Sequence, residues 1–364
     1  MEAEIAEKIA SGSSTPVDRR IGFCHRPLFI IIILVVLSVA LAVAIVLSVG
    51  MGATKIGVRE VLASLPNRHR TGSTDSVILF DIRLPRVLAS VLVGAALSVA
   101  GLLFQGLFRN PMADPYVIGS SGGAALGAGI GLFLLPRFSL LGFGAAAAMA
   151  FAGSVATIAL VYWLARIGGR VPVVTLLLAG FAVSTILSYS TYFLVVLDDN
   201  FGLRTRVLAS WLTGVISVPR WTQLEVTALM IGCGLIFCFP LARRLNTLAL
   251  GEDYARQVGV QVEKTHLAII LTGSLITAAA VSLGGVISFV GLIVPHMARL
   301  VLGPDHVRLL PVTAISGSIF LVLADTLART LLAPSEIPVG LLTAFIGGPF
   351  FLYLLRRTRR EYAL

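Results

Sequence analysis

The chain has 364 residues, of which 57% are hydrophobic and 13% are charged, and its formal net charge is +10. Soluble domains carry about 25% charged residues, so this composition excludes an ordinary soluble protein. The Lys and Arg residues lie at the ends of apolar runs, which indicates membrane topology and argues against a surface for nucleic acid.

The amino-terminal sequence is polar at first and then basic. Residues 1–20 are predicted to be a disordered cytoplasmic tail, and residues 21–364 a single transmembrane domain. The apolar run from Pro27 to about Val49 is longer than the core of a signal peptide, which has about 7–15 residues, and no clear cleavage site follows it. We interpret this run as a retained first span with a basic cytoplasmic flank.

Further apolar runs predict an all-α, polytopic membrane protein with about ten transmembrane helices, since about 20 apolar residues cross a bilayer. The predicted spans lie near residues 27–50, 84–107, 117–135, 139–166, 173–197, 221–241, 265–283, 286–301, 309–332 and 338–356. An even number of spans places both termini on the same side. The basic sequence 356–360 agrees with a cytoplasmic location for both.

Glycines in the third predicted span share a regular spacing. Gly119, Gly123, Gly127 and Gly131 repeat every four residues, which places them on one face of a helix. Small residues on such a face allow two membrane helices to pack backbone to backbone. The spacing therefore predicts a close contact with a neighbouring helix.

Two connections between spans are longer than the topology requires. The connection 198–220 is predicted to hold a short outer helix. Within the connection 246–265, Glu252 and Asp253 suit the start of a helix, Arg256 suits its later turn and Gly259 suits its end. This short cytoplasmic helix is equally consistent with a plain interfacial helix and with a docking element for a soluble partner.

Sequence patterns of catalysis and of metal binding are missing. The sequence contains no Gly-x-x-x-x-Gly-Lys-Ser/Thr phosphate loop, no Gly-x-Ser-x-Gly elbow and no His-Glu-x-x-His motif. Its three cysteines, Cys24, Cys233 and Cys238, have no spacing typical of a zinc site or of a disulfide framework. We therefore predict no catalytic residue, no metal ligand and no cofactor site in this chain.

One acidic residue, Asp325, lies well inside an apolar span, and Arg329 follows it on the same helical face. Intramembrane charges are candidates for function, but a structural ion pair is at least an equal alternative here. A proton- or sodium-driven secondary transporter would need buried acids or broken helices at mid-membrane. An intramembrane enzyme would need a nucleophile and a base, and the sequence suggests no such pair.

Several separated motifs resemble those of the FecCD-type permeases, the membrane subunits of type II ATP-binding-cassette (ABC) importers for iron–siderophore chelates, heme and cobalamin. The resemblance covers roughly residues 40–358. Its motifs are Arg83-Leu-Pro-Arg86, Gly101 with Gln105, Arg109-Asn-Pro111, Leu250-Gly251, Gly284 to His296, Gly303-Pro-Asp305-His306, Asp325 with Arg329, Glu336 to Gly340 and Gly347-Gly-Pro-Phe350.

The resemblance implies an assembly in a bacterial or archaeal cytoplasmic membrane. In it, two copies of a ten-helix permease form a path at the dimer axis. Two cytoplasmic ATPases, which hold ATP and Mg²⁺, and a periplasmic or lipid-anchored binding protein complete the importer. The substrate is expected to be a bulky iron chelate, with cobalamin or another corrinoid as the alternative.

The resemblance also assigns roles to residues. The segment 246–262 matches the coupling helices that sit in clefts of the ATPases. Its candidate coupling residues are Leu250, Gly251, Glu252, Tyr254, Ala255, Arg256, Val258 and Gly259. On the outer side, Arg329 matches a basic residue that pairs with acids of the binding protein, and Lys55 and Arg59 lie in the equivalent outer loop.

Overall fold

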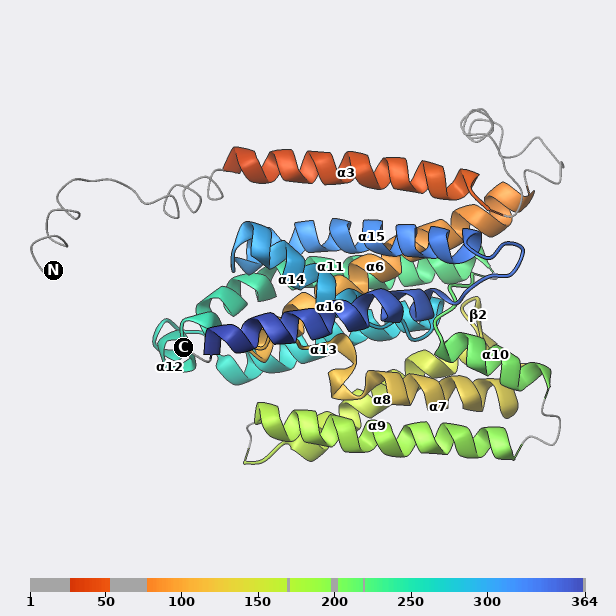
Figure 1. Ribbon diagram of the computed structural model, residues 1–364. Helices are drawn as coiled ribbons and strands as arrows, with labels where there is room; N and C mark the ends of the chain where they lie inside the picture. The colour runs from red at the N-terminus through yellow and green to blue at the C-terminus, as the bar shows by residue number, and fades with distance from the viewer. Residues whose placement is uncertain (1–26, 53–76, 169–170, 198–201, 219, 363–364) are drawn as a thin grey trace, which may run out of the picture.

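The computed structural model describes residues 27–52, 77–168, 171–197, 202–218 and 220–362 and is almost entirely helical in these ranges (Figure 1). The predicted disordered tail, residues 1–20, lies outside the described residues. The helices run roughly parallel or antiparallel to one another and form one elongated bundle (Figure 1). This arrangement confirms the all-α class.

The structure contains the following elements in chain order. They are α3 (Pro27–Gly50), the π-helical turn η2 (Ile78–Arg83), α6 (Leu84–Leu107), the 3₁₀ turn η3 (Pro115–Ile118), α7 (Ser120–Phe133), β1 (Ser139–Leu140), β2 (Phe143–Gly144), α8 (Ala145–Ala165), α9 (Val173–Val196), α10 (Leu203–Leu212), α11 (Trp221–Ala249), α12 (Glu252–Gln257), α13 (Val262–Gly284), α14 (Val290–Leu302), α15 (His306–Thr330) and α16 (Val339–Tyr362). The two strands pair as a small antiparallel hairpin.

Seven helices of the described chain are long and apolar enough to cross a membrane. They are Leu28–Gly50, Ile78–Leu107, Ala145–Ala165, Val173–Val196, Trp221–Ala249, Val262–Gly284 and His306–Thr330. Two shorter apolar helices, Val290–Leu302 and Val339–Tyr353, add to them. The polytopic membrane fold is therefore confirmed, and ten spans is an approximate count.

The predicted third span is shorter in the structure than a full membrane crossing. α7 has 14 residues, which at 1.5 Å per residue extend about 21 Å, less than the about 30 Å of a hydrocarbon core. The preceding residues 115–118 form a 3₁₀ turn, whose N-cap Asp114 accepts a hydrogen bond from the Tyr116 amide. Gly119 then adopts a left-handed conformation with φ of 94°, so the α-helix begins only at Ser120.

Helix α6 is the central element of the bundle. Most of its residues are buried, and it packs against α11, α13, α14 and α15. Glycines allow these close approaches: a methyl group at Gly101 would overlap the carbonyl oxygen of Gly291, and one at Gly94 would overlap that of Gly317. The backbones of α6, α14 and α15 therefore meet without side chains between them.

Gln105 of α6 compensates for a proline in α14. Pro295 has no N–H group, so the carbonyl of Gly291, four residues earlier, lacks its usual helical donor. The Gln105 Nε2 atom donates to the Leu292 carbonyl at 3.0 Å and to the Gly291 carbonyl at 3.4 Å. A buried side-chain amide thus donates to the carbonyl that the proline leaves open, and to the next one, and connects α14 to α6.

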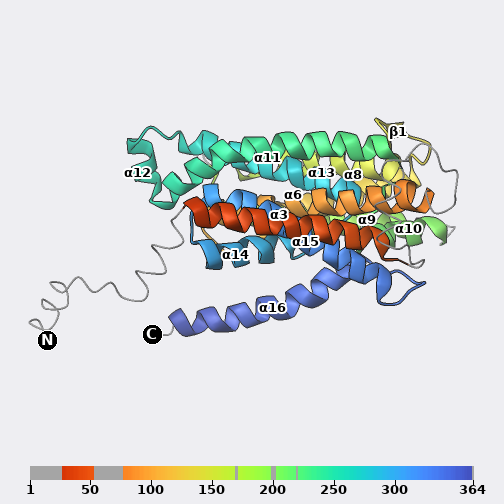
Figure 2. The same cartoon turned by 90° about the horizontal axis from the view of Figure 1, so that it is seen from above.

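Helix α16 lies at the edge of the bundle. Figure 2 shows it diverging from the other helices toward its carboxy-terminal end. Its principal packing contacts are with α14 and α15. Much of its apolar surface, including Phe345, Leu352 and Tyr353, is therefore exposed in the single chain.

Candidate functional site

The short helix α12 lies at one end of the bundle, between α11 and α13 (Figure 1). Gly251 precedes it with φ of 124°, and Gly259 follows it with φ of 87°. Side chains with a Cβ rarely adopt such backbone angles, so glycine permits both sharp changes of direction. α12 therefore stands as a separate six-residue element within the predicted segment 246–262.

One side of α12 is fixed to the bundle and the other is open. Ala255 is fully buried, and its carbonyl accepts a hydrogen bond from the Val260 amide at 2.8 Å. Leu250, Tyr254 and Val258 are all large, apolar or aromatic, and exposed. An exposed apolar surface beside charged residues is typical of a protein–protein contact.

Arg256 connects α12 to the next helix. Arg256 lies 3.0 Å from Glu263 of α13 and 3.6 Å from both Glu252 and Asp253. Each such exposed pair contributes only about 0–1 kcal/mol. The set nevertheless links α12 to the first turn of α13, so Glu252 and Arg256 orient the helix while its apolar residues stay free for a partner.

Arg109 supports the same end of the bundle from another helix. It follows α6 with a left-handed φ of 48°, and its Nη2 atom donates to the Leu248 carbonyl at 2.6 Å. Leu248 lies in the last turn of α11, where a cation interacts favourably with the helix dipole. Sequence reasoning placed Arg109 only in a motif, because a contact over 139 positions leaves no local signal.

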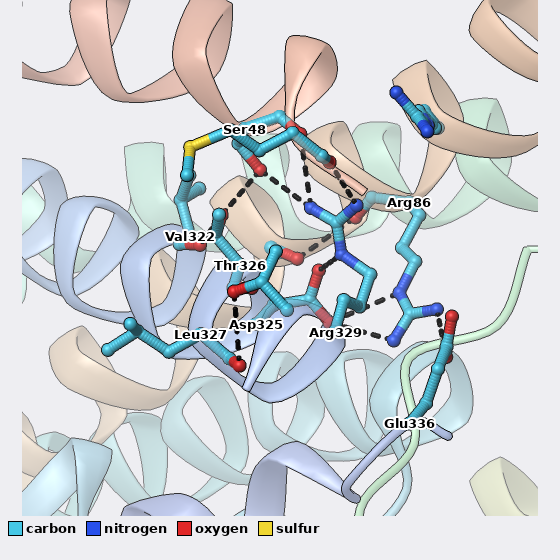
Figure 3. Close-up of polar contacts among 12 residues, drawn as sticks. Ser48, Arg86, Val322, Asp325, Thr326, Leu327, Arg329 and Glu336 are labelled. Carbon is cyan, nitrogen blue, oxygen red and sulfur yellow. Dashed lines mark hydrogen bonds and ion pairs between the residues drawn. The ribbon is translucent and has the colours of Figure 1, made fainter. Parts of the chain in front are cut away.

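A cluster of charged side chains surrounds Asp325 (Figure 3) near the carboxyl end of α15, which is at the opposite end of the bundle from α12 (Figure 1). Asp325 of α15 accepts from Arg329 Nε at 2.9 Å and from Arg86 at 3.0–3.1 Å, through Nη2 and Nε. Arg86 also contacts Glu336 at 2.7 Å. The Asp325 side chain is only 1% exposed, so two arginines share one buried carboxylate.

Arg329 uses its remaining donors to hold the end of α3. It donates to the Ser48 carbonyl at 3.2 Å, to the Ser48 hydroxyl at 2.9 Å and to the Met51 carbonyl at 3.2 Å (Figure 3). Arg83 donates to the carbonyls of Val49 and Gly50 at 3.1 and 3.3 Å. Two cationic side chains therefore cap the last turn of α3, as helix carboxyl ends favour.

The three residues predicted to dock a binding protein are placed differently. Arg329 is 6% exposed and engaged inside its own chain, so a partner could reach it only after these contacts rearranged. Lys55 and Arg59 lie outside the described residues. The docking role of all three stays a prediction.

The glycines of α7 lie against α8. A methyl group at Gly123 would overlap the Gly153 carbonyl, and one at Gly127 would overlap the Met149 carbonyl. Gly131 approaches the Ala145 carbonyl in the same way. Gly119 differs because it lies at the turn before α7 and approaches α9 instead.

Metal chemistry finds no support in the part of the chain that the structure covers. Its residues contain no group of three or more His, Cys, Asp or Glu side chains that could hold a metal ion. The arrangement instead combines a membrane bundle, a short helix between two glycines at one end and a buried ion-pair cluster at the other. These features suit a transport subunit.

Comparison with known proteins agrees with this geometry. The model of the FecCD transport family matches residues 39–357. The chain belongs to the FecCD transport family. Among FecCD proteins, the cobalamin import system permease protein BtuC of Halobacterium salinarum is 46% identical over 80% of this chain and 76% of its own length.

Two further proteins are similar to this chain over most of their length. The hemin transport system permease protein HmuU of Yersinia pestis is 41% identical over 86% of this chain and 92% of its own. A solved structure described as an inward-facing, metal-chelate type ABC transporter matches with a TM-score of 0.76 and 31% identity, over 90% of this chain and 99% of the other.

Membership in the FecCD family decides the class of protein. The chain is a multi-pass membrane permease subunit of an ABC importer, and it is not itself an enzyme. ATP hydrolysis belongs to a separate subunit, and family members work with ATPase and substrate-binding partners. The expectation from sequence motifs is thereby confirmed at the level of the family.

Proposed function

We propose that this permease moves a bulky iron chelate, a siderophore or heme, across the cytoplasmic membrane by alternating access. Relatives named for hemin, for iron–hydroxamate and for ferric dicitrate support this substrate class. The alternative is cobalamin or another corrinoid, which the relative at 46% identity supports. The buried, fully paired Asp325 gives no support to an ion-coupled mechanism, since its oxygens are held by two arginines.

The test is uptake by cells that lack this chain. Deletion should abolish accumulation of a ferric siderophore or of hemin and leave cobalamin accumulation unchanged, and the wild-type gene should restore the lost uptake. Loss of cobalamin uptake alone, with iron uptake intact, would establish the corrinoid alternative.

We further propose that α12 transmits the motion of two cytoplasmic ATPases, which bind ATP and Mg²⁺. The exposed side chains of Leu250, Tyr254 and Val258 support this role because they offer an apolar contact at the end of the bundle. Alternating access requires that each partner bind the two states of the permease with different affinity. α12 is attached to the bundle through α11 and through the ion pair of Arg256 with α13. A movement of the bound ATPases would therefore be transmitted to the bundle.

The proposed topology places α12 and both termini in the cytoplasm of a bacterial or archaeal cell. The first described residue of α3 and the last of α16 lie at the α12 end of the bundle, which supports this orientation (Figure 1). The exposed Arg243 and Arg244 are at the same end of α11, as the positive-inside rule expects.

The proposed assembly contains two copies of residues 21–364 as the permease domain, with a binding protein at the α10 end. The exposed apolar surface of α16 supports contact with a second copy, because this helix packs mainly against α14 and α15 in the single chain. The mass of the detergent-purified complex tests the stoichiometry. Two permease chains with two ATPases are expected, and a single permease chain with its ATPase would contradict the dimer.

A further inference from the structure

An apolar groove of about 520 Å³ lies between α3, α14 and α15. Its lining comes from all three helices and includes Val36, Met297 and Phe320. Ser316 is the one polar side chain among the lining residues. The volume falls within the range of about 300–1,000 Å³ that is typical of ligand pockets.

The groove lies along the amino-terminal half of α3, which is less buried than its carboxyl end. Ser48 and Val49, near the carboxyl end of α3, are buried, and arginines hold the carbonyls there. In the amino-terminal half, the side chains that line the groove are exposed or half-buried, with Val36 60% exposed. The helix therefore covers α15 firmly at the α10 end and leaves an open gap toward the α12 end.

The position of the groove matches one leaflet of a bilayer. Its residues on α15, Val312 to Phe320, span eight steps of 1.5 Å, or about 12 Å. Half of a hydrocarbon core is about 15 Å thick. On α3 the lining starts at Ile32, five residues after the helix begins at Pro27. The groove thus lies within the hydrocarbon region, in the half of the bundle that carries α12.

A basic residue, Arg308, lies one turn beyond the groove, toward the level where a lipid headgroup would sit. Arg308 precedes Val312 by one turn on the same stripe of α15 as Ser316 and Phe320. Its side chain is partly exposed and pairs with Asp305 at 3.0 Å. Positive charge near a membrane surface attracts anionic lipids.

The surface proposed above for a second copy of the chain is a different one. It lies on α16, and no residue of α16 is among those that line the groove. Residues 1–26 are largely polar or charged and do not suit an apolar lining.

We propose that this groove binds one acyl chain of an anionic phospholipid, with the headgroup at the α12 end beside Arg308. An apolar gap that faces lipid forfeits dispersion contacts when it is empty, and a single hydrocarbon chain would restore them. The bound lipid would complete the packing of α3 against α14 and α15. This site is independent of the substrate that the importer carries.

Two matched variants of α3 test the acyl-chain site. Val36 lines the groove and Val35 does not, although both are valines with similar exposure, 60% and 57%. The full-length chain is purified in detergent, and phosphatidylglycerol or phosphatidylcholine with identical acyl chains is titrated in native mass spectrometry. Val36→Trp should weaken binding of the first phosphatidylglycerol about tenfold or more. If the tryptophan prevents only two methylene groups of the acyl chain from being buried, the affinity already falls about tenfold. Val35→Trp should change it by less than about twofold.

Two variants on α15 test the same site without a change in α3. Ser316→Phe fills the groove from α15 and should weaken the same binding. Arg308→Gln should reduce the preference for phosphatidylglycerol over phosphatidylcholine while acyl binding persists. Equal binding in Val36→Trp, Ser316→Phe and the wild type would overturn the proposal, as would equal losses in Val36→Trp and Val35→Trp. Equal affinity of the wild type for both lipids would overturn the anionic headgroup.

Discussion

Asp325 shows how one intramembrane charge is made stable. Both of its carboxylate oxygens are occupied, one by Arg86 and the other by Arg329, and the side chain is removed from solvent. A buried charge is tolerated only when it is paired and hydrogen-bonded. Arg329 extends the cluster to the last turn of α3, and Arg86 extends it to Glu336 before α16 (Figure 3). The geometry therefore favours the structural alternative over a proton relay.

Removal of the Asp325 charge should destabilise the bundle strongly. Asp325→Asn would leave Arg86 and Arg329 close together without their shared carboxylate, and breaking a buried pair typically costs about 3–5 kcal/mol. Glu336→Gln is the matched control because Glu336 is about half exposed and contacts Arg86 alone, so its loss should cost about 0–1 kcal/mol. Thermal unfolding in detergent compares the two, and equal melting temperatures would contradict a structural role for Asp325.

Gln105 and Pro295 should behave as a coupled pair. Gln105→Leu removes the donor to the Gly291 and Leu292 carbonyls, and buried acceptors left unpaired cost about 1–3 kcal/mol. Pro295→Ala restores a backbone N–H to the Gly291 carbonyl, so the second change should reduce the cost of the first. A double-mutant cycle on thermal stability measures this coupling. Additive effects would show that Gln105 does not compensate for the proline.

At the scale of elements, sequence patterns predicted most helices but not their interruptions. The ranges predicted near 27–50, 84–107 and 173–197 agree with α3, α6 and α9, because each is a continuous apolar run between polar ends. The apolar pattern around α7 did not indicate the turn that Asp114, Pro115 and Gly119 form before this helix. α11 continues past Pro240 to Ala249, because a single proline can kink a helix without ending it.

The α7–α8 contact should not tolerate a large side chain. Gly123→Leu would place atoms where the Gly153 carbonyl and the Thr157 hydroxyl lie, and overpacking typically costs about 1–3 kcal/mol. Gly232 in α11 provides the control, since a Cβ there meets nothing within 4 Å. Gly232→Leu should leave the melting temperature nearly unchanged in detergent. If the two variants melt alike, the face of Gly123 contacts lipid and not α8.

The exposed side chains of α12 should determine attachment of the ATPase. Leu250→Asp with Tyr254→Asp places charges on the apolar contact while the buried Ala255 and the Arg256–Glu263 pair remain. Copurification of the ATPase should be lost, and the melting temperature of the permease should be retained. Leu203→Asp, an equally exposed leucine on α10 at the opposite end, should keep the ATPase bound. Retained copurification in the α12 variant would contradict the coupling assignment.

At the scale of the whole molecule, α6 connects the two candidate sites. Arg86 in its first turn joins the outer charged cluster, and Arg109 just beyond its end holds α11 next to α12. Sequence motifs contained both arginines but could not show which residues they contact, because Asp325 and Leu248 lie 239 and 139 positions away. The family could therefore be predicted from motif order, whereas the contacts required the folded chain.

The outer basic residues should affect association with the binding protein in two separable ways. Lys55→Glu with Arg59→Glu reverses charge in the outer loop, so association should slow and its salt dependence should weaken, since charge complementarity acts mainly on the association rate. Basal ATPase activity should persist, because α12 lies at the other end of the bundle. Arg329→Gln should instead lower the melting temperature, since Arg329 is 6% exposed and holds Asp325 and Ser48. Stopped-flow association at low and high salt separates these effects. Unchanged kinetics in the loop variant would place the dock elsewhere and leave Arg329 as a structural residue.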